Sequence, residues 1–160
     1  MAKEKKEKKE KTSSSKEEES VDNYEKRLPA LLPFARPLAP KKLNKKVLKT
    51  VKKASKAKHV KRGVKEVVKS LRKGEKGLVI IAGDISPGDV ISHIPVLCED
   101  NKVPFVFIPS KEDLGSAGAT KRPTSCVMIV PGGGKKKDDK SKTDEYREGF
   151  DEIVKEIPVI

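Results

Sequence analysis

The chain has 160 residues, of which 34% are hydrophobic, and its formal net charge is +13. This length suits one domain with polar flanks, and no apolar run approaches the length of a membrane span, which argues against a membrane protein. The N-terminus is charged from Lys3 onward, so we expect no signal peptide. The two cysteines show no paired-ligand spacing and are expected to be free thiols, which indicates an intracellular, reducing compartment.

Two segments precede the expected domain. Residues 1–20 contain seven Lys and six Glu and have almost nothing to bury, so we expect a disordered tail. Residues 21–40 include the stretch LPALLPFARPLAP, whose four prolines forbid a regular helix. The leucines and Phe34 need cover, which predicts an extended, proline-rich arm packed on the domain.

Two amphipathic helices follow, in the most basic part of the chain. Within residues 41–56 four apolar side chains recur at helical spacing, and lysines fill the other face. A second helix opens at Gly63 and ends near Gly74, a residue type suited to a helix C-terminus. Residues 58–61, between the helices, suit a short strand.

The rest of the chain alternates apolar runs with helical patterns. Continuous apolar runs are typical of strands that are buried on both faces. The alternation predicts an α/β fold over residues 41–160, a three-layer αβα sandwich around a small mixed four-stranded sheet. The expected elements are strands at 78–82, 105–108 and 126–130, helices at 86–101 (broken near Pro95) and 110–118, a mobile loop at 131–142, and a last helix from Thr143 or Asp144.

Three features of the sequence could in principle indicate catalysis or metal binding, but each lacks the neighbouring residues that such a site requires. Cys98 and Cys126 lack metal-ligand spacing and lie beside apolar runs, so buried free thiols are expected. The run Gly132–Lys135 lacks the first glycine of a phosphate-binding loop, and Lys136 follows where Ser or Thr would bind the metal. His93 has no nearby nucleophile. We therefore expect no enzyme, no metal and no cofactor.

The positive charge is concentrated in one segment. Residues 41–76 hold 16 Lys/Arg and 2 Asp/Glu, a local charge of +14, so the rest of the chain sums to about −1 and this segment carries the whole positive excess. Clustered cations favour a polyanion, because neutralising phosphates releases counterions. A solvated helix face is the alternative, although such surfaces usually mix both signs. The segment predicts nucleic-acid binding.

The strongest candidate site is the basic turn from Lys58 into the helix that begins after Gly63. Backbone N–H groups at a helix N-terminus attract phosphate, and glycine lets a backbone approach closely. Lys65 and Lys69 lie on one face at i, i+4. Glu66 has two interpretations, an ion pair with Lys69 or a carboxylate that reads bases.

The loop at residues 119–125 is a second candidate. It joins a helix to a buried strand, so it lies at an end of the sheet. Arg122 can stack on a base or donate two hydrogen bonds to a phosphate. An ordinary polar loop is the alternative.

Together these segments resemble the family of small archaeal and eukaryotic ribosomal and ribonucleoprotein subunits that bind kink-turn RNA. The resemblance covers roughly residues 28–158. The arm at 28–40 and the loop at 119–125 resemble the H/ACA ribonucleoprotein branch of this family. The motifs that carry the resemblance, in order, are Lys61-Arg62-Gly63-Val64-Lys65-Glu66, Ile81-Ala82-Gly83-Asp84-Ile85-Ser86-Pro87 and His93-Ile94-Pro95-Val96-Leu97-Cys98-Glu99-Asp100.

The resemblance implies a non-catalytic RNA-binding subunit of the nucleus and nucleolus, in a particle that pseudouridylates ribosomal and spliceosomal RNA and supports ribosome biogenesis. The implied partners are an H/ACA guide RNA, a dyskerin-type pseudouridine synthase, a short bridging nucleolar subunit and a glycine-arginine-rich subunit. The expected RNA contacts are Lys58, Lys61, Arg62, Gly63, Lys65, Glu66, Lys69, Val90, Lys121, Arg122, Pro123 and Thr124.

One position departs from the kink-turn specialists of the family. They carry Asn where this chain has Lys65, and a lysine cannot accept a hydrogen bond from a base. We therefore expect general RNA affinity, with placement supplied partly by protein partners. A box C/D or spliceosomal kink-turn-binding protein is the alternative within the family, and Lys65 argues against it.

Overall fold

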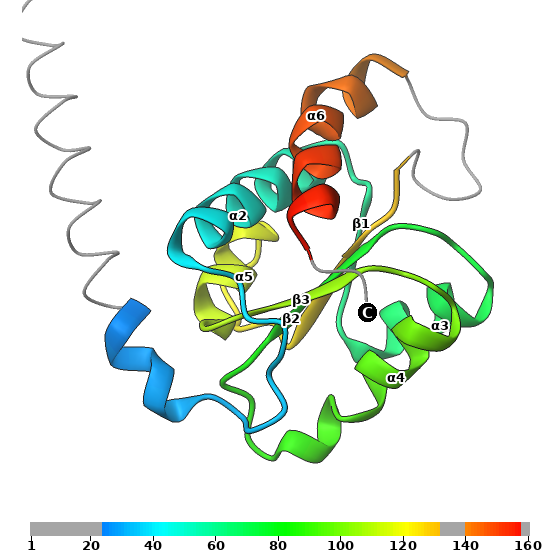
Figure 1. Ribbon diagram of the computed structural model, residues 1–160. Helices are drawn as coiled ribbons and strands as arrows, with labels where there is room; N and C mark the ends of the chain where they lie inside the picture. The colour runs from blue at the N-terminus through cyan, green and yellow to red at the C-terminus, as the bar shows by residue number, and fades with distance from the viewer. Residues whose placement is uncertain (1–23, 132–139, 158–160) are drawn as a thin grey trace, which may run out of the picture.

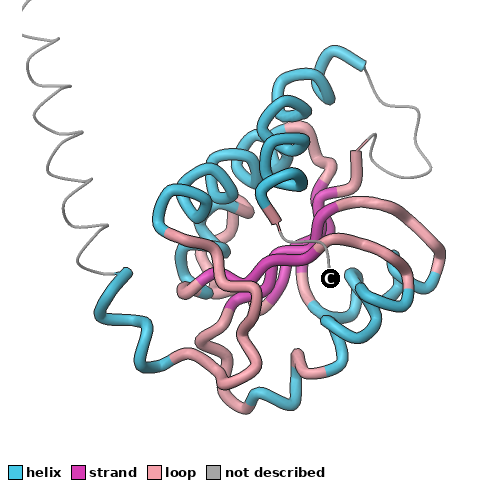
Figure 2. The backbone as a smooth tube through the Cα atoms, in the orientation of Figure 1, coloured by secondary structure: helices cyan, strands magenta, loops and turns pink. Residues whose placement is uncertain are grey.

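The computed structural model describes residues 24–131 and 140–157, with side chains placed throughout except at 140–145. Its centre is a four-stranded mixed sheet in the order β1-β4-β2-β3 (Figure 2). The strands are β1 (Val60–Arg62), β2 (Leu78–Ala82), β3 (Phe105–Ile108) and β4 (Cys126–Ile129). Strand β2 is parallel to β3 and antiparallel to β4, and β1 is an edge strand antiparallel to β4.

Helices cover both faces of this sheet (Figure 1). Helices α2 (Lys41–Lys56), α5 (Lys111–Ala117) and α6 (Lys140–Glu156) pack on one face, and α3 (Val64–Arg72) and α4 (His93–Asp100) on the other. A hydrophobic core lies on each face of the sheet, and alternate residues of β2 point into opposite cores. Ile80 is buried in the core beneath α2, α5 and α6, and Ile81 in the core beneath α3 and α4. The predicted three-layer αβα sandwich is confirmed.

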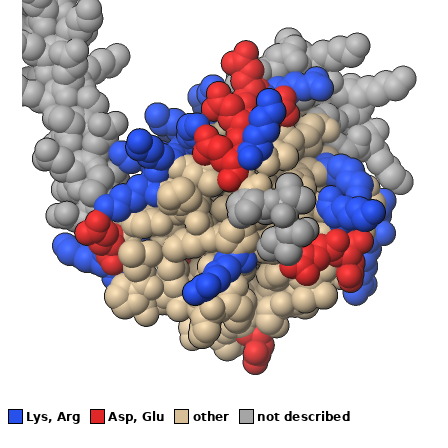
Figure 3. All heavy atoms as spheres, viewed as in Figure 1, with Lys and Arg blue, Asp and Glu red and all other residues tan. Residues whose placement is uncertain are grey.

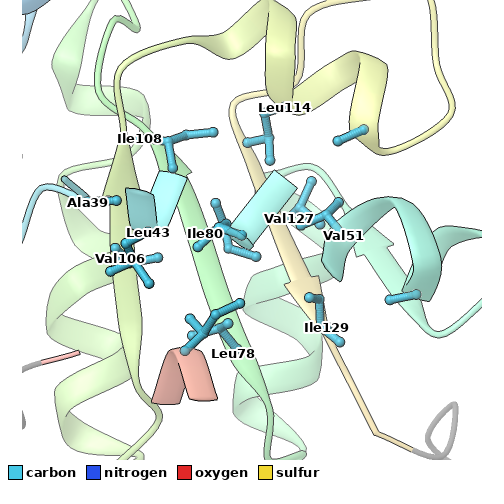
Figure 4. Close-up of a cluster of buried hydrophobic side chains, with 14 of the residues drawn as sticks. Ala39, Leu43, Val51, Leu78, Ile80, Val106, Ile108, Leu114, Val127 and Ile129 are labelled. Atoms are coloured by element: carbon cyan, nitrogen blue, oxygen red, sulfur yellow. The ribbon is translucent and has the colours of Figure 1, made fainter. Parts of the chain in front are cut away.

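The apolar positions of α2 explain its place in the fold. Leu43, Val47 and Val51 recur at i, i+4, i+8 and are buried against Ile80 and Leu114 (Figure 4). The lysines that separate these residues are left on the outer side. The side of α2 that faces the sheet therefore supplies core, and the opposite side supplies positive charge.

Two of the predicted elements have other boundaries in the structure. The predicted 86–101 helix is a 3₁₀ turn, η2 (Gly88–Val90), followed by α4, so the break falls at residues 91–92 and not near Pro95. Pro95 is the third residue of α4, where no N–H donor is needed within the helix. Helix α6 begins at Lys140, so the last three residues of the predicted mobile loop 131–142 are helical, and residues 132–139 lie outside the described part.

The arm packs on the sheet, but it is neither fully extended nor fully covered. Residues 24–27 are helical and η1 (Leu28–Ala30) follows. Leu38 then forms a parallel bridge with Phe107, so the arm runs along the β3 edge. Leu28 and Phe34 remain 39% and 40% exposed, which corrects the expectation that the domain would cover them.

Candidate nucleic-acid interface

The loops that carry the predicted site residues leave the sheet at one end. Because β1 runs antiparallel to β4, the last residue of β1 lies beside the first part of β4, with Arg62 paired to Val127. The amide N–H of Gly63 donates to the carbonyl of Cys126 at 2.9 Å. The start of α3 therefore adjoins the end of the loop at 119–125, two segments that are about 60 residues apart in the chain.

Arg62 ties the two segments together through its side chain. Its Nη1 donates a hydrogen bond of 2.7 Å to the carbonyl oxygen of Gly118, which closes α5. A guanidinium used in this way stabilises the loop and brings a positive charge to its base. We expected Arg62 among the RNA contacts, and no local sequence pattern indicates this structural bond.

Gly63 occupies a backbone conformation that favours glycine, with φ +88° and ψ 155°. A Cβ atom placed on Gly63 would meet nothing within 4 Å, so the space beside this residue is open. The constraint is therefore the backbone angle and not crowding. The turn at the start of α3 is therefore open on the side of Gly63, where we expect a ligand backbone to approach.

Glu66 does not form the ion pair with Lys69 that was one of the two roles suggested by the sequence. Its Oε2 accepts a hydrogen bond of 3.2 Å from the backbone N–H of Arg62, so the carboxylate caps the entrance to α3. Although both side chains are described, no ion pair joins Glu66 to Lys69 within 4.0 Å. The exposed carboxylate is thereby held over the turn at which RNA contact is expected.

The basic side of α3 borders an open groove. Lys65 and Lys69 share it, as their i, i+4 spacing predicted, and half-buried Val64 and Val68 form its apolar part. His93, at the start of α4, lies at the opposite side of the groove. Arg72 and Lys73 lengthen the basic border beyond the predicted residues.

Backbone hydrogen bonds and close packing hold the loop at 119–125. The N–H of Thr124 donates to the carbonyl of Lys111 at 3.2 Å, and a Cβ on Gly115 would lie only 2.3 Å from the carbonyl oxygen of Arg122. Lys121, Arg122 and Pro123 are exposed. Thr124 is only 9% exposed, so its side chain does not face solvent as we expected of an RNA contact.

Three further predicted contacts lie nearby in the sequence or the fold. Lys58 is exposed with φ +61°, and Lys61 is half-buried in β1. Val90 is 43% exposed in η2, on the loop that follows the β2 end next to Ser125. The fold therefore places Val90 at the same end of the sheet as the α3 turn.

The described residues offer little for catalysis or metal binding. They contain no group of three or more His, Cys, Asp and Glu side chains that could hold a metal ion. Cys98 and Cys126 are buried and free, and burial raises the pKa of each thiol to about 12. None of the described helices is long and apolar enough to cross a membrane.

A compact αβα sandwich with a glycine turn, a basic helix and a fixed polar loop at one end of its sheet defines a small RNA-binding domain of ribonucleoproteins. The chain belongs to the ribosomal protein L7Ae/L30e/S12e/Gadd45 family, whose model matches residues 45–139. The resemblance to kink-turn RNA-binding subunits is thereby confirmed.

Within this family, the chain is similar to proteins named as subunits of H/ACA ribonucleoproteins. H/ACA ribonucleoprotein complex subunit NHP2 of Saccharomyces cerevisiae is 74% identical over 141 residues, which cover 88% of this chain and 90% of that protein. H/ACA ribonucleoprotein complex subunit nhp2 of Schizosaccharomyces pombe is 66% identical over 139 residues, covering 87% and 89% of the two chains. A solved structure named Giardia lamblia 15.5kD RNA binding protein has a TM-score of 0.69 and 33% identity, covering 79% of this chain and 97% of that one.

Proposed function

We propose that this chain is a non-catalytic RNA-binding subunit of a box H/ACA ribonucleoprotein, which serves guide-directed pseudouridylation of ribosomal and spliceosomal RNA and ribosome biogenesis. The fungal relatives named as H/ACA subunits support this proposal, since each aligns over almost nine-tenths of the chain. They also support the absence of catalytic activity, because the named role is that of a subunit in a family of RNA-binding proteins.

One observation carries the assignment of the site. The hydrogen bonds from Arg62 to Gly118 and from Gly63 to Cys126 fix the α3 turn against the loop at 119–125. Exposed cations therefore stand on two segments whose relative position is fixed, with Lys65 and Lys69 on one and Lys121 and Arg122 on the other. Such preorganisation reduces the entropy that RNA binding would cost.

The residues have three roles in this proposal. Lys58, Lys61, Lys65, Lys69 and Lys121 neutralise phosphates, while Arg122, Pro123 and Val90 offer flat or apolar surfaces to unstacked bases. Glu66 accepts from base amino or imino groups through the carboxylate that already caps the turn. Thr124 is left out of the proposed contacts, because its side chain is buried.

Selectivity for the correct RNA comes partly from partners in this account. Lys65 can donate to phosphate but cannot form the paired donor and acceptor contact that an asparagine makes with a base. The proposed partners are the guide RNA, a dyskerin-type synthase, a short bridging subunit and a glycine-arginine-rich subunit, in the nucleolus. Lys65 also favours this assignment over a box C/D or spliceosomal kink-turn binder.

The direct test is to purify the tagged full chain from cells and to sequence the RNA that it retains. The expected result is enrichment of guide RNAs that carry box H and ACA elements, together with a pseudouridine synthase. A triple variant of the site, with Lys65→Ala, Lys69→Ala and Arg122→Ala, should bind these RNAs more weakly than the unmodified chain when each protein is purified and titrated alone. Recovery of box C/D guides or spliceosomal RNA instead would contradict the proposal.

A further inference from the structure

The exposed side of α2 carries more positive charge than the site described above uses. The helix contains eight lysines and no Asp or Glu in 16 residues. Like charges at i, i+4 repel and destabilise an isolated helix by a few tenths of a kcal/mol per pair. Burial of the apolar side keeps α2 folded, but it does not explain why the opposite side lacks acidic residues.

A groove beside this helix gathers several of the lysines. It has a volume of about 330 Å³ and lies where α6 packs against α2. Gly149 allows this close approach, because a Cβ there would lie 2.8 Å from Thr50 Oγ1. The lysines that border the groove are Lys46, Lys49, Lys52, Lys53 and Lys56.

Acidic neighbours neutralise only part of this surface. Lys46 forms ion pairs of 3.5 Å with Glu152 and 2.6 Å with Glu156, both on α6. Where side chains are described, Lys49, Lys52 and Lys56 have no acidic partner within 4.0 Å. Figure 3 shows the basic side chains along α2 with acidic side chains grouped beside them. These three lysines, which lack an acidic partner among the described side chains, lie in the C-terminal half of the helix.

The C-terminal half of α2 is joined to the proposed RNA site at α3 by the short strand β1. Helix α2 packs on one face of the sheet and α3 on the other, and the edge strand β1 connects them through Lys58 and Lys61. Lysines therefore follow the chain around the β1 edge, from one face of the sandwich to the other. From Lys49 to Lys56 the rise along the helix is about 10 Å, enough to meet more than one phosphate of a stem.

We propose that Lys49, Lys52 and Lys56, with the groove beside α6, form a second RNA-binding surface that holds the backbone of the duplex stem flanking the RNA seated at α3. The proposal rests on the proposed function, because it extends the same RNA across the β1 edge. Lysines without base-reading neighbours bind by charge alone, so this surface adds affinity for a stem but no sequence preference.

The experiment is a titration of the full chain against two RNAs that share the same bulged segment. One RNA ends shortly after that segment, and the other continues into a long duplex stem. The variant replaces Lys49, Lys52 and Lys56 by Gln, which keeps length and helix propensity. The matched control replaces Lys26, Lys102 and Lys155, exposed lysines on other segments, by Gln.

The α2 variant should bind the long-stem RNA about tenfold more weakly, with a salt slope shallower by about 2 to 3 because three phosphate contacts are lost. Its affinity for the short RNA should stay within twofold of the unmodified chain, and replacing the same three lysines by Arg should preserve long-stem binding. Unchanged affinity for both RNAs would overturn the proposal, as would an equal loss with the control variant. If the unmodified chain bound neither RNA, the proposed function itself would fail.

A protein partner is the other class of ligand that a lysine surface can bind. If the α2 variant bound the long-stem RNA normally but failed to assemble with acidic subunits of a reconstituted particle, the RNA proposal would be overturned. Circular dichroism of each variant should show unchanged helix content, so that any loss of affinity reports on the surface.

Discussion

Arg62 donates from its guanidinium to the carbonyl oxygen of Gly118 at 2.7 Å, across 56 residues of sequence. The bond joins the end of β1 to the end of α5, so it couples the α3 turn to the loop at 119–125. Together with the backbone bond from Gly63 to Cys126, this side chain fixes the two segments that we propose as the RNA-binding site relative to each other.

Replacing Arg62 by Ala should weaken both the fold and the site. The loss of a charged hydrogen bond that is partly open to solvent should lower the free energy of unfolding by about 1 kcal/mol. RNA affinity should fall further than it does for Lys61→Ala, because the loop also loses its anchor. Urea denaturation and RNA titration measure the two effects. Arg147→Ala, an exposed arginine on α6, is the control and should change neither.

Replacing Gly63 by Ala should destabilise the chain through its backbone. The φ of +88° with ψ of 155° forces a Cβ-bearing residue into a strained region, which costs about 1–3 kcal/mol, even though no atom lies within 4 Å of the new methyl group. Gly74→Ala has a comparable positive φ at +73° after α3. Both variants should unfold at lower urea, but only Gly63→Ala should lose RNA affinity under conditions in which the protein is folded.

Tyr146 provides a test of stability that is independent of RNA. Its hydroxyl lies 2.8 Å from Nδ1 of His59 in a buried contact that joins α6 to the residue before β1. Tyr146→Phe should lower the free energy of unfolding by about 1–2 kcal/mol and leave RNA affinity unchanged. Tyr24→Phe removes the half-buried 2.7 Å bond to the carbonyl of Ala39 and should cost less. A larger loss at Tyr24 would contradict the burial argument.

The two buried cysteines predict how stability depends on alkaline pH. Burial raises the pKa of Cys98 and Cys126 from 9.0 to about 12, so the folded state keeps both thiols neutral. Above about pH 9 the unfolded chain releases those protons first, and the free energy of unfolding therefore falls between pH 9 and 12. Thermal unfolding of Cys98→Ala/Cys126→Ala should show a shallower decline over this range. Equal slopes would exclude the thiols as the cause.

Lys65 separates this chain from kink-turn specialists. The unmodified chain alone should prefer a kink-turn over a mutated stem within about tenfold, since one base contact of about 1–3 kcal/mol is missing. Lys65→Asn should increase that preference and lower affinity for unstructured RNA, because one positive charge is lost. Paired titrations at fixed salt measure both. A thousandfold preference in the unmodified chain would remove the physical reason for favouring the H/ACA assignment.

The sequence was sufficient to predict most of the fold, for reasons visible in particular elements. The apolar run at Leu78–Ala82 forms a strand that is buried at every position, and the spacing of Leu43, Val47 and Val51 defines the buried side of α2. Pro95 was misleading because the effect of a proline depends on its position within the helix. In the first turn of α4 it interrupts nothing.

The details of the site were less predictable, because they depend on contacts between segments far apart in the chain. Glu66 could be assigned to α3, but its bond to the N–H of Arg62 depends on the path of the turn at Gly63. Thr124 is a polar residue in a polar loop, where exposure is usual, yet it is buried because the loop packs against α5. Local pattern gave no signal for either contact.

The central claim is that RNA binds where α3 and the loop at 119–125 meet. Amide chemical shifts of the isotopically labelled chain, recorded during titration with a bulged stem-loop RNA, test it residue by residue. The account predicts the largest changes at Gly63, Lys65, Lys69, Lys121 and Arg122, with smaller changes along the second half of α2. Changes confined to α5 and the arm, with these five amides unmoved at saturation, would contradict it.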